Sequence, residues 1–171
     1  NFAIEHFMRP DTGAAGRFNA DGFWTRSAFV GLSGGFGAVT IGRTTTSLFV
    51  QTLSFNAFGD AFGFSPSIRH YFSSGTTTGD TGWSDAVRYV SPRFGGASFT
   101  LHAAEPGNDG GGRNYGASAG WSGGPAALGL AWQSVKRGGA VNDTKTWQLA
   151  GSYDLKMAKL FAQYGEVDDD T

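Results

Sequence analysis

The sequence predicts an all-β protein: an antiparallel up-and-down sheet of the kind that closes into a transmembrane barrel. Three observations support this fold class. Apolar and polar residues alternate with period two along many short segments. Glycine supplies 28 of the 171 residues and aromatic residues 15%, whereas cysteine is absent, which favours strands and turns over a helical bundle. Short turns alternate with long polar loops along the chain, as they do in outer-membrane barrels.

The clearest single element is a β-hairpin. Two apolar runs, 26–33 and 38–43, flank the turn 33–37, whose glycines accept the positive φ angles of a tight reversal. Arg26 and Arg43 stand at its two far ends. An apolar body with charged ends predicts strands that cross a hydrocarbon layer between two aqueous layers.

The same alternation predicts about nine strands in all. Outside the hairpin these are 2–5, 85–91, 98–103, 115–121, 128–133, 147–154 and 159–164. One face of each strand is apolar, whereas the other carries Gly, Ser, Thr, Gln and charges, which suits a water-filled lumen better than a dry core. The aromatic residues expected near strand ends, as in an interfacial girdle, are Trp121, Trp132, Trp147, Tyr153 and Tyr164.

The longest connection, residues 44–85, is rich in Gly, Ser, Thr and Phe and shows no period. We therefore expect a long loop without regular structure. Such segments in compact proteins are usually functional or disordered.

Composition excludes several classes of protein. A net charge of −1 without a basic block argues against a nucleic-acid partner. The absence of cysteine removes disulfides and thiolate metal sites, and His6, His70 and His102 lack the spacing of metal ligands. The uncharged run 114–135 contains five glycines and Pro125, so a membrane-spanning helix is not expected there. We expect neither a metal nor a cofactor.

Several motifs follow one another along nearly the whole chain. They are FAIEH, DTGAAG, RSAFVGLSGGFGAVTIGRT, AVRYVSPRFGG and YGASAGWSGGPAALGLAWQ. In order and spacing, most strongly over 24–44 and 86–96, this series resembles the general porins of Gram-negative bacteria, closest to their neisserial and β-proteobacterial branch. The resemblance implies a homotrimer of barrels of about sixteen strands, each narrowed by an inward-folded extracellular loop. Residues 1–171 would then form a single barrel domain, with 44–85 as its constriction loop.

The chain departs from that family at both ends. It lacks the family's first two strands, and it ends on DDDT without a terminal strand that closes on an aromatic residue. A set of nine strands would leave two edges unpaired in hydrocarbon, where each unpaired N–H or C=O costs several kcal/mol. We therefore expect a partial chain of a protein about twice as long.

The resemblance implies five residues at a pore constriction. Glu5 occupies the position of a lumenal acid in the family, and Arg26 and Arg43 occupy the positions of lumenal arginines. Asp60 falls where acids of the loop cluster, and Arg88 occupies the strand after the loop. Arginines opposite an acidic loop would create a transverse field that orients polar solutes and sets ion preference.

The period-two alternation predicts different faces of the sheet for these arginines. It places Arg26 and Arg88 on the lumenal face, but it puts Arg43 on the apolar face with Val39 and Ile41. Either a β-bulge turns Arg43 inward, or the residue lies beyond the bilayer.

The predicted function is a passive diffusion channel of the bacterial outer membrane. It would pass ions and small hydrophilic solutes, contact outer-membrane lipid and lipopolysaccharide, assemble as a homotrimer and have no enzymatic activity. Two alternatives remain open from the sequence. One is a β-rich surface adhesin or lectin-like module with a dry interior. The other is an aspartic protease, because DTG occurs at 11–13 and 80–82, although both copies lie in glycine loops instead of at strand ends.

Overall fold

The structure is a computed structural model that describes residues 1–19, 21–73, 80–106, 111–136 and 143–170. Within these residues, a single nine-stranded antiparallel sheet follows the order of the chain from β1 to β9. Its strands are β1 (Phe2–Glu5), β2 (Ser27–Gly34), β3 (Gly37–Thr45), β4 (Gly82–Val90), β5 (Ala97–Ala104), β6 (Asn114–Gly123), β7 (Ala126–Val135), β8 (Asp143–Asp154) and β9 (Lys159–Asp170). The predicted up-and-down topology is confirmed.

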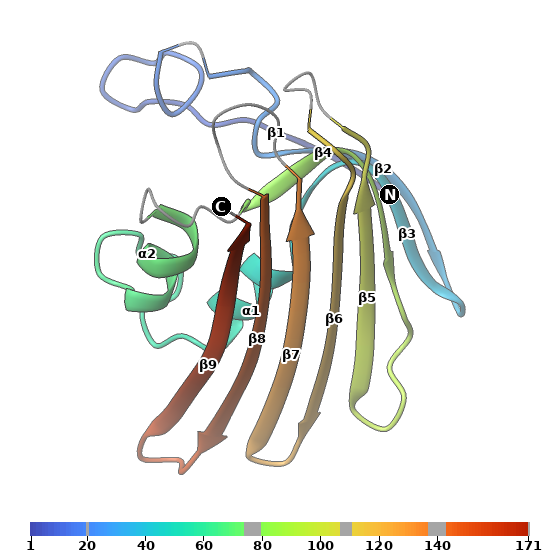
Figure 1. The fold of residues 1–171 in the computed structure, drawn as a ribbon, viewed down its shortest axis with the longest axis vertical. Coiled ribbons are helices and arrows are strands. Elements are labelled where there is room, and N and C mark those ends of the chain that lie inside the picture. The colour runs from blue at the N-terminus through green and yellow to red at the C-terminus, as the bar shows by residue number, and fades with distance from the viewer. Residues whose placement is uncertain (20, 74–79, 107–110, 137–142, 171) are drawn as a thin grey trace.

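The sheet is a curved wall that carries two short helices on its concave side (Figure 1). In the described part of the chain it does not close on itself, because β1 and β9 are its two edges. The helices are α1 (Ser47–Ser54) and α2 (Pro66–Ser73). Among the described residues, neither of these helices nor any other is long and apolar enough to cross a membrane.

Short turns gather at one end of the wall and long connections at the other. The strand pairs β2–β3, β4–β5, β6–β7 and β8–β9 are joined by short reversals, whereas the connections between these pairs are long. Gly37 shows why glycine is needed at the first reversal. It has a φ of 103°, and a Cβ there would overlap the carbonyl oxygen of Val90 on β4. The predicted alternation of short turns and long loops is thus observed.

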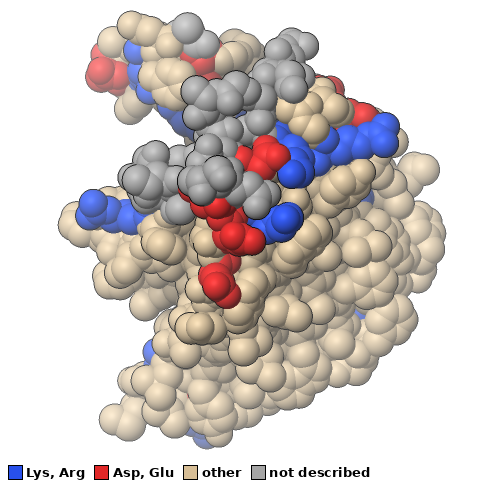
Figure 2. Space-filling view, in the orientation of Figure 1, with Lys and Arg blue, Asp and Glu red and all other residues tan. Residues whose placement is uncertain are grey.

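The two faces of the sheet differ as the alternation predicted. On the convex face, Leu130 and Leu149 face each other across β7 and β8 and are 50% and 51% exposed. Their neighbours on the concave face, Gln133 and Gln148, are 1% and 0% exposed. In Figure 2 the strands present an almost uncharged surface, and charged residues gather at the end that carries the long connections. The sheet therefore exposes apolar side chains and buries polar ones.

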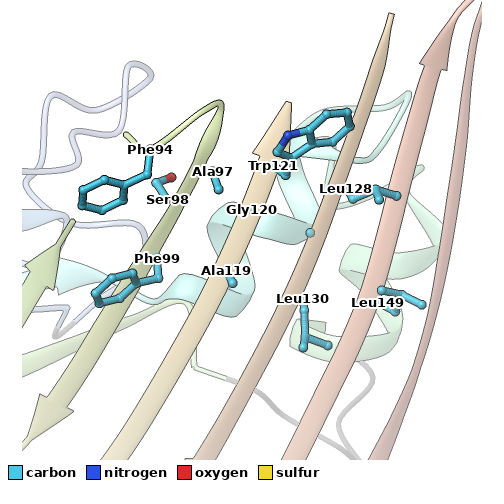
Figure 3. Close-up of a pocket in the computed structure, with 11 residues that line it drawn as sticks. Phe94, Ala97, Ser98, Phe99, Ala119, Gly120, Trp121, Leu128, Leu130 and Leu149 are labelled. Atoms are coloured by element: carbon cyan, nitrogen blue, oxygen red, sulfur yellow. The ribbon is translucent and has the colours of Figure 1, made fainter. Parts of the chain in front are cut away.

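A shallow apolar groove of about 350 Å³ crosses this convex face over β5, β6 and β7. Phe94 and Phe99 lie on one side of it and Leu128 on the other, as Figure 3 shows. Ala119 and Gly120 lie between them, so the floor of the groove is backbone and small side chains. An exposed groove with so little polar surface suits contact with hydrocarbon.

The aromatic residues lie mostly where the sequence predicted. Trp132 pairs with Trp147 near the long-connection end of β7 and β8, and Trp121 and Tyr153 lie near the short turns. The prediction for Tyr164 was wrong. Strand β9 continues to Asp170, beyond the expected end at 164, so Tyr164 lies in mid-strand, with its ring 5.6 Å from that of Trp147.

The expectation that 44–85 lacks regular structure was wrong for residues 47–54 and 66–73, which form α1 and α2, and for its two ends, since β3 continues to Thr45 and β4 begins at Gly82. Part of the segment, 74–79, lies outside the described residues. The helices have only eight residues each, too few turns for a clear 3.6-residue period. Thr46 caps α1, since its hydroxyl accepts from the N–H of Phe49 and donates to the carbonyl of Asp80.

Amide side chains attach α1 to the concave wall. Gln51 donates to the backbone carbonyl of Gln148 at 2.8 Å and to its side-chain oxygen at 3.2 Å. The Gln148 amide donates in return to the Thr52 hydroxyl at 3.0 Å. Gln163 on β9 donates to the carbonyls of Thr52 and Phe55, the last at the C-terminal end of α1.

The wall also leaves space for the helix. Position 129 on β7 is glycine, and a Cβ there would lie 2.7 Å from the side chains of both Gln51 and Phe55. A small apolar cluster joins the two helices to the wall; its buried members are Leu48, Ile68, Tyr71, Phe72 and Ala131. The segment after β3 is therefore folded inward and packed, not projecting from the rim.

We predict that Gln148→Ala destabilises the docking of α1. The change removes an acceptor of Gln51 and a donor to Thr52 at a fully buried position, which should lower the free energy of unfolding by about 1–3 kcal/mol. Thermal unfolding of the purified protein in detergent measures this loss of stability. Ser152→Ala, on the same face of β8 nearer the short turn, is the control and should change stability by about 0.5 kcal/mol or less. Equal loss in both variants would contradict the docking role.

Candidate functional site

A cavity of about 720 Å³ opens between the wall and the inward-folded segment near the long-connection end. We call it the outer cavity. Four of the five predicted site residues line it: Glu5, Arg26, Arg43 and Asp60. They come from β1, the end of the first long connection, β3 and the segment between the two helices. Tertiary structure thus brings together residues that are up to 55 positions apart (from 5 to 60) in the sequence.

Glu5 and Arg26 form an ion pair on the wall. The Arg26 Nε lies 3.5 Å from a Glu5 carboxylate oxygen, and the side chains are 59% and 48% exposed. The Arg26 guanidinium also lies 5.6 Å from the ring centre of Phe7. Such an exposed pair contributes about 0–1 kcal/mol to stability, so its charges remain available to solutes.

Arg43 reaches the outer cavity through a β-bulge. The register between β3 and β4 shifts between Gly42 and Thr44, and Gly42 has a φ of 125°. The Arg43 Nε donates to the carbonyl of Thr25 at 2.7 Å, and another guanidinium nitrogen donates to the Ser84 hydroxyl at 2.9 Å. Of the two placements left open by alternation, the structure has the bulge.

Arg17, which no sequence pattern singled out, also lines the outer cavity. Its guanidinium makes two bonds to the Asp21 carboxylate, at 2.9 and 3.2 Å, and lies 5.1 Å from the ring centre of Phe7. Hydrogen bonds from the Arg17 guanidinium and then from its backbone N–H lower the pKa of Asp21 from 3.8 to about 2. Arg17 lies in a loop without periodicity, and only its spacing from Asp21 could have pointed to it.

The charges of the outer cavity nearly cancel. Its lining contains three arginines and two carboxylates, and Arg17 has a further acidic partner in Asp21. Asp60 belongs to the inward segment, whereas Arg43 belongs to β3 of the wall and Arg26 directly precedes β2. A solute in this cavity would therefore lie between groups of opposite charge.

Arg88 does not line the outer cavity. It lies on β4 opposite His102 of β5, nearer the short turns, and lines a second cavity of about 390 Å³. We call this the inner cavity; it lies between α1 and β4 to β7 and also includes Arg93 and Ser47. Val50 of α1 lines both cavities, so α1 lies between them. The role of all five predicted site residues in a constriction stays a prediction.

Other candidate chemistry finds no support in the geometry. The described residues contain no group of three or more His, Cys, Asp or Glu able to hold a metal ion. His102 bonds to the Thr44 hydroxyl at 3.0 Å and its ring lies 4.8 Å from that of Trp83. Of the two DTG aspartates, Asp80 accepts a bond from the Trp83 indole, and Asp11 lies in an exposed turn. Neither stands at the end of an apolar strand, as a protease dyad requires.

Comparison with known proteins agrees with the fold. The family model described as Gram-negative porin matches residues 1–171. The outer membrane porin protein 32 of Delftia acidovorans is 33% identical over 170 residues, which cover 93% of this chain and 47% of that protein. Among solved structures, the anion-selective porin from Comamonas acidovorans superposes with a TM-score of 0.77 at 24% identity, covering 99% of this chain and 53% of its own. The chain thus spans about half the length of these relatives.

We predict that Asp21→Asn loosens the loop that carries Arg17. The wild-type pair should persist from neutral pH down to about pH 4 and be lost only as the pH falls through about 2, because the lowered pKa keeps Asp21 charged above it. In the variant, peptides that span the loop should exchange amide hydrogens faster at neutral pH, as measured by mass spectrometry. Asp11→Asn, a charge-matched change in the same loop, should leave the exchange unchanged; equal effects would exclude a specific pair.

Proposed function

The chain belongs to the Gram-negative porin family, and on this premise we propose that it forms one side of a water-filled channel for passive diffusion of ions and small hydrophilic solutes. Family membership and its outer-membrane relatives identify it as part of a β-barrel of the bacterial outer membrane and not as an enzyme. The adhesin and protease alternatives receive no support from these comparisons.

One observation carries the proposal: the polar face of the sheet is concave and the apolar face convex. Gln133, Gln148 and Thr146 lie inside, whereas Leu130 and Leu149 lie outside. A soluble β-protein buries the apolar face, because burial of apolar surface drives folding. The arrangement is reversed in a barrel that has lipid outside and water inside.

We further propose that 44–85 is the constriction loop and that the outer cavity belongs to the narrowest part of the passage. Arg17, Arg26 and Arg43 would oppose Asp60, and Glu5 would orient Arg26 through their ion pair. A hydrated ion or small polar solute would pass between these charges, while the width of the gap sets the size limit.

Assembly and lipid contacts are also proposals. We infer a homotrimer from the family, with lipid and lipopolysaccharide around the rest of the convex face. Phe2 and Leu32 on this face are 75% and 76% exposed, so another copy of the chain or a lipid would cover them.

We predict opposite labelling of cysteines placed on the two faces. The chain has no cysteine, so the Ser118→Cys and Leu130→Cys variants each contain a single thiol within residues 1–171. In lipid vesicles a charged thiol reagent should modify Ser118→Cys from the lumen and leave Leu130→Cys unmodified. Both should react after denaturation, which controls for thiol reactivity. Modification of Leu130→Cys alone would refute the channel.

We predict that Arg26→Glu shifts ion preference toward cations. The substitution replaces a cation of the outer cavity by a second carboxylate beside Glu5. The full-length protein in a planar bilayer under a salt gradient should show a reversal potential displaced toward the cation value. Lys156→Glu, at the exposed turn between β8 and β9, makes the same charge change away from both cavities and is the control. A reversal potential unchanged by Arg26→Glu would remove Arg26 from the site.

A further inference from the structure

The inner cavity differs from the outer cavity in its charge. Arg88 and Arg93 both line it, and none of its lining residues is acidic. Neither arginine takes part in an ion pair among the described residues, where every pair lies elsewhere. In the part of the chain that the structure describes, no carboxylate therefore neutralises the two guanidinium groups of the inner cavity.

Two buried polar atoms of this cavity lack hydrogen-bond partners within the described part of the chain. They are the Nε of Arg88 and the hydroxyl oxygen of Ser47, the first residue of α1. The Ser47 side chain belongs to a residue that is only 5% exposed, so bulk solvent does not satisfy it. Buried polar groups in native proteins are almost always paired, which indicates that something else bonds these atoms.

Hydroxyl groups complete the lining of the inner cavity. They come from α1 and from β5 and β6 on the facing wall: Ser47, Ser54, Ser98, Thr100, Ser118 and Ser122. Guanidinium groups present several N–H donors in a planar fork, and hydroxyls add donors from other directions. This donor set matches an anion with several oxygens better than it matches a spherical chloride ion.

We propose that the inner cavity is a binding site for a phosphate group, held by Arg88, Arg93 and Ser47 between α1 and the wall. The volume of about 390 Å³ exceeds the roughly 30 Å³ share of one water more than tenfold, so a phosphate with a small organic substituent also fits. The proposal rests on the proposed function, because phosphate would reach this cavity on the concave face only through the channel. It deepens that function by naming a solute class that the passage retains.

The site would act after the constriction. Arg93 and Ser122 place the inner cavity on the short-turn side of α1, whereas the outer cavity lies on the long-connection side. Short turns face the periplasm in outer-membrane barrels. A phosphate that has passed the nearly neutral outer cavity would therefore be held at the periplasmic side of the loop.

Calorimetric titration of the full-length protein in detergent with inorganic phosphate tests the site directly. We expect saturable binding that Arg88→Gln and Arg93→Gln each weaken about tenfold, because each removes a charge-assisted bond. Arg26→Gln removes the same charge from the outer cavity and should change the affinity by less than about twofold. A small phosphate monoester, glycerol phosphate, should compete with inorganic phosphate, and chloride at equal ionic strength should not.

Ser47→Ala separates binding from packing. Since the Ser47 hydroxyl has no protein partner among the described residues, its removal should leave the melting temperature unchanged while weakening phosphate binding. A lower melting temperature with unchanged binding would assign the hydroxyl a structural role and overturn its place in the site.

Three results would overturn the proposal as a whole: no saturable binding, equal weakening by Arg26→Gln and Arg93→Gln, or full competition by chloride. Bilayer recordings keep this test distinct from that of the channel. Absence of conductance would refute the proposed function, whereas the calorimetric result decides the phosphate site in either case.

Discussion

The structure depends on one constraint: successive side chains of a β-strand point to opposite sides of the sheet. Along nine strands in sequence order, this alternation gives the sheet a mostly apolar convex face and a mostly polar concave face. Backbone N–H and C=O groups between the strands are paired across the sheet, which is the condition for crossing hydrocarbon. The rule fails locally at the bulge of Gly42, where Arg43 turns into the outer cavity. That exception supplies one of the wall's charges to the outer cavity.

Because the concave face of the sheet is polar, hydrogen bonds help to hold the inward-folded segment that contains α1. In a soluble protein a helix docks through an apolar stripe, whereas α1 docks largely through amide hydrogen bonds between Gln51, Thr52 and Gln148. Gly129 lets the helix approach the wall, and only a small apolar cluster around Leu48 and Ile68 adds burial. Such bonds are directional, so they fix the orientation of the loop as well as its distance. The loop can therefore divide the concave face into two cavities with fixed walls.

The two cavities differ in the acidic residues that line them in the described part of the chain. Glu5 and Asp60 accompany the arginines of the outer cavity, and the lining of the inner cavity has none. A balanced cavity orients a passing solute without retaining it, since attraction and repulsion largely cancel. Unbalanced guanidinium groups in a partly buried cavity attract anions more strongly, because the lower local dielectric screens them less. Transit and retention would thus occur at successive points along one passage.

Local sequence by itself determined the strands, their faces and the order of turns and loops. These follow from period two and from glycine at tight reversals, which are properties of neighbouring residues. The resemblance of its motifs further implied a constriction with Glu5, Arg26, Arg43 and Asp60, which line one cavity in the structure; their role in a constriction stays a prediction. Only the tertiary structure decided that 47–54 and 66–73 become helices, because segments of eight residues gain their stability from packing against the wall. Tertiary structure also added Arg17 to one cavity and separated Arg88 into another, since no local pattern records which side of a docked helix a distant side chain reaches.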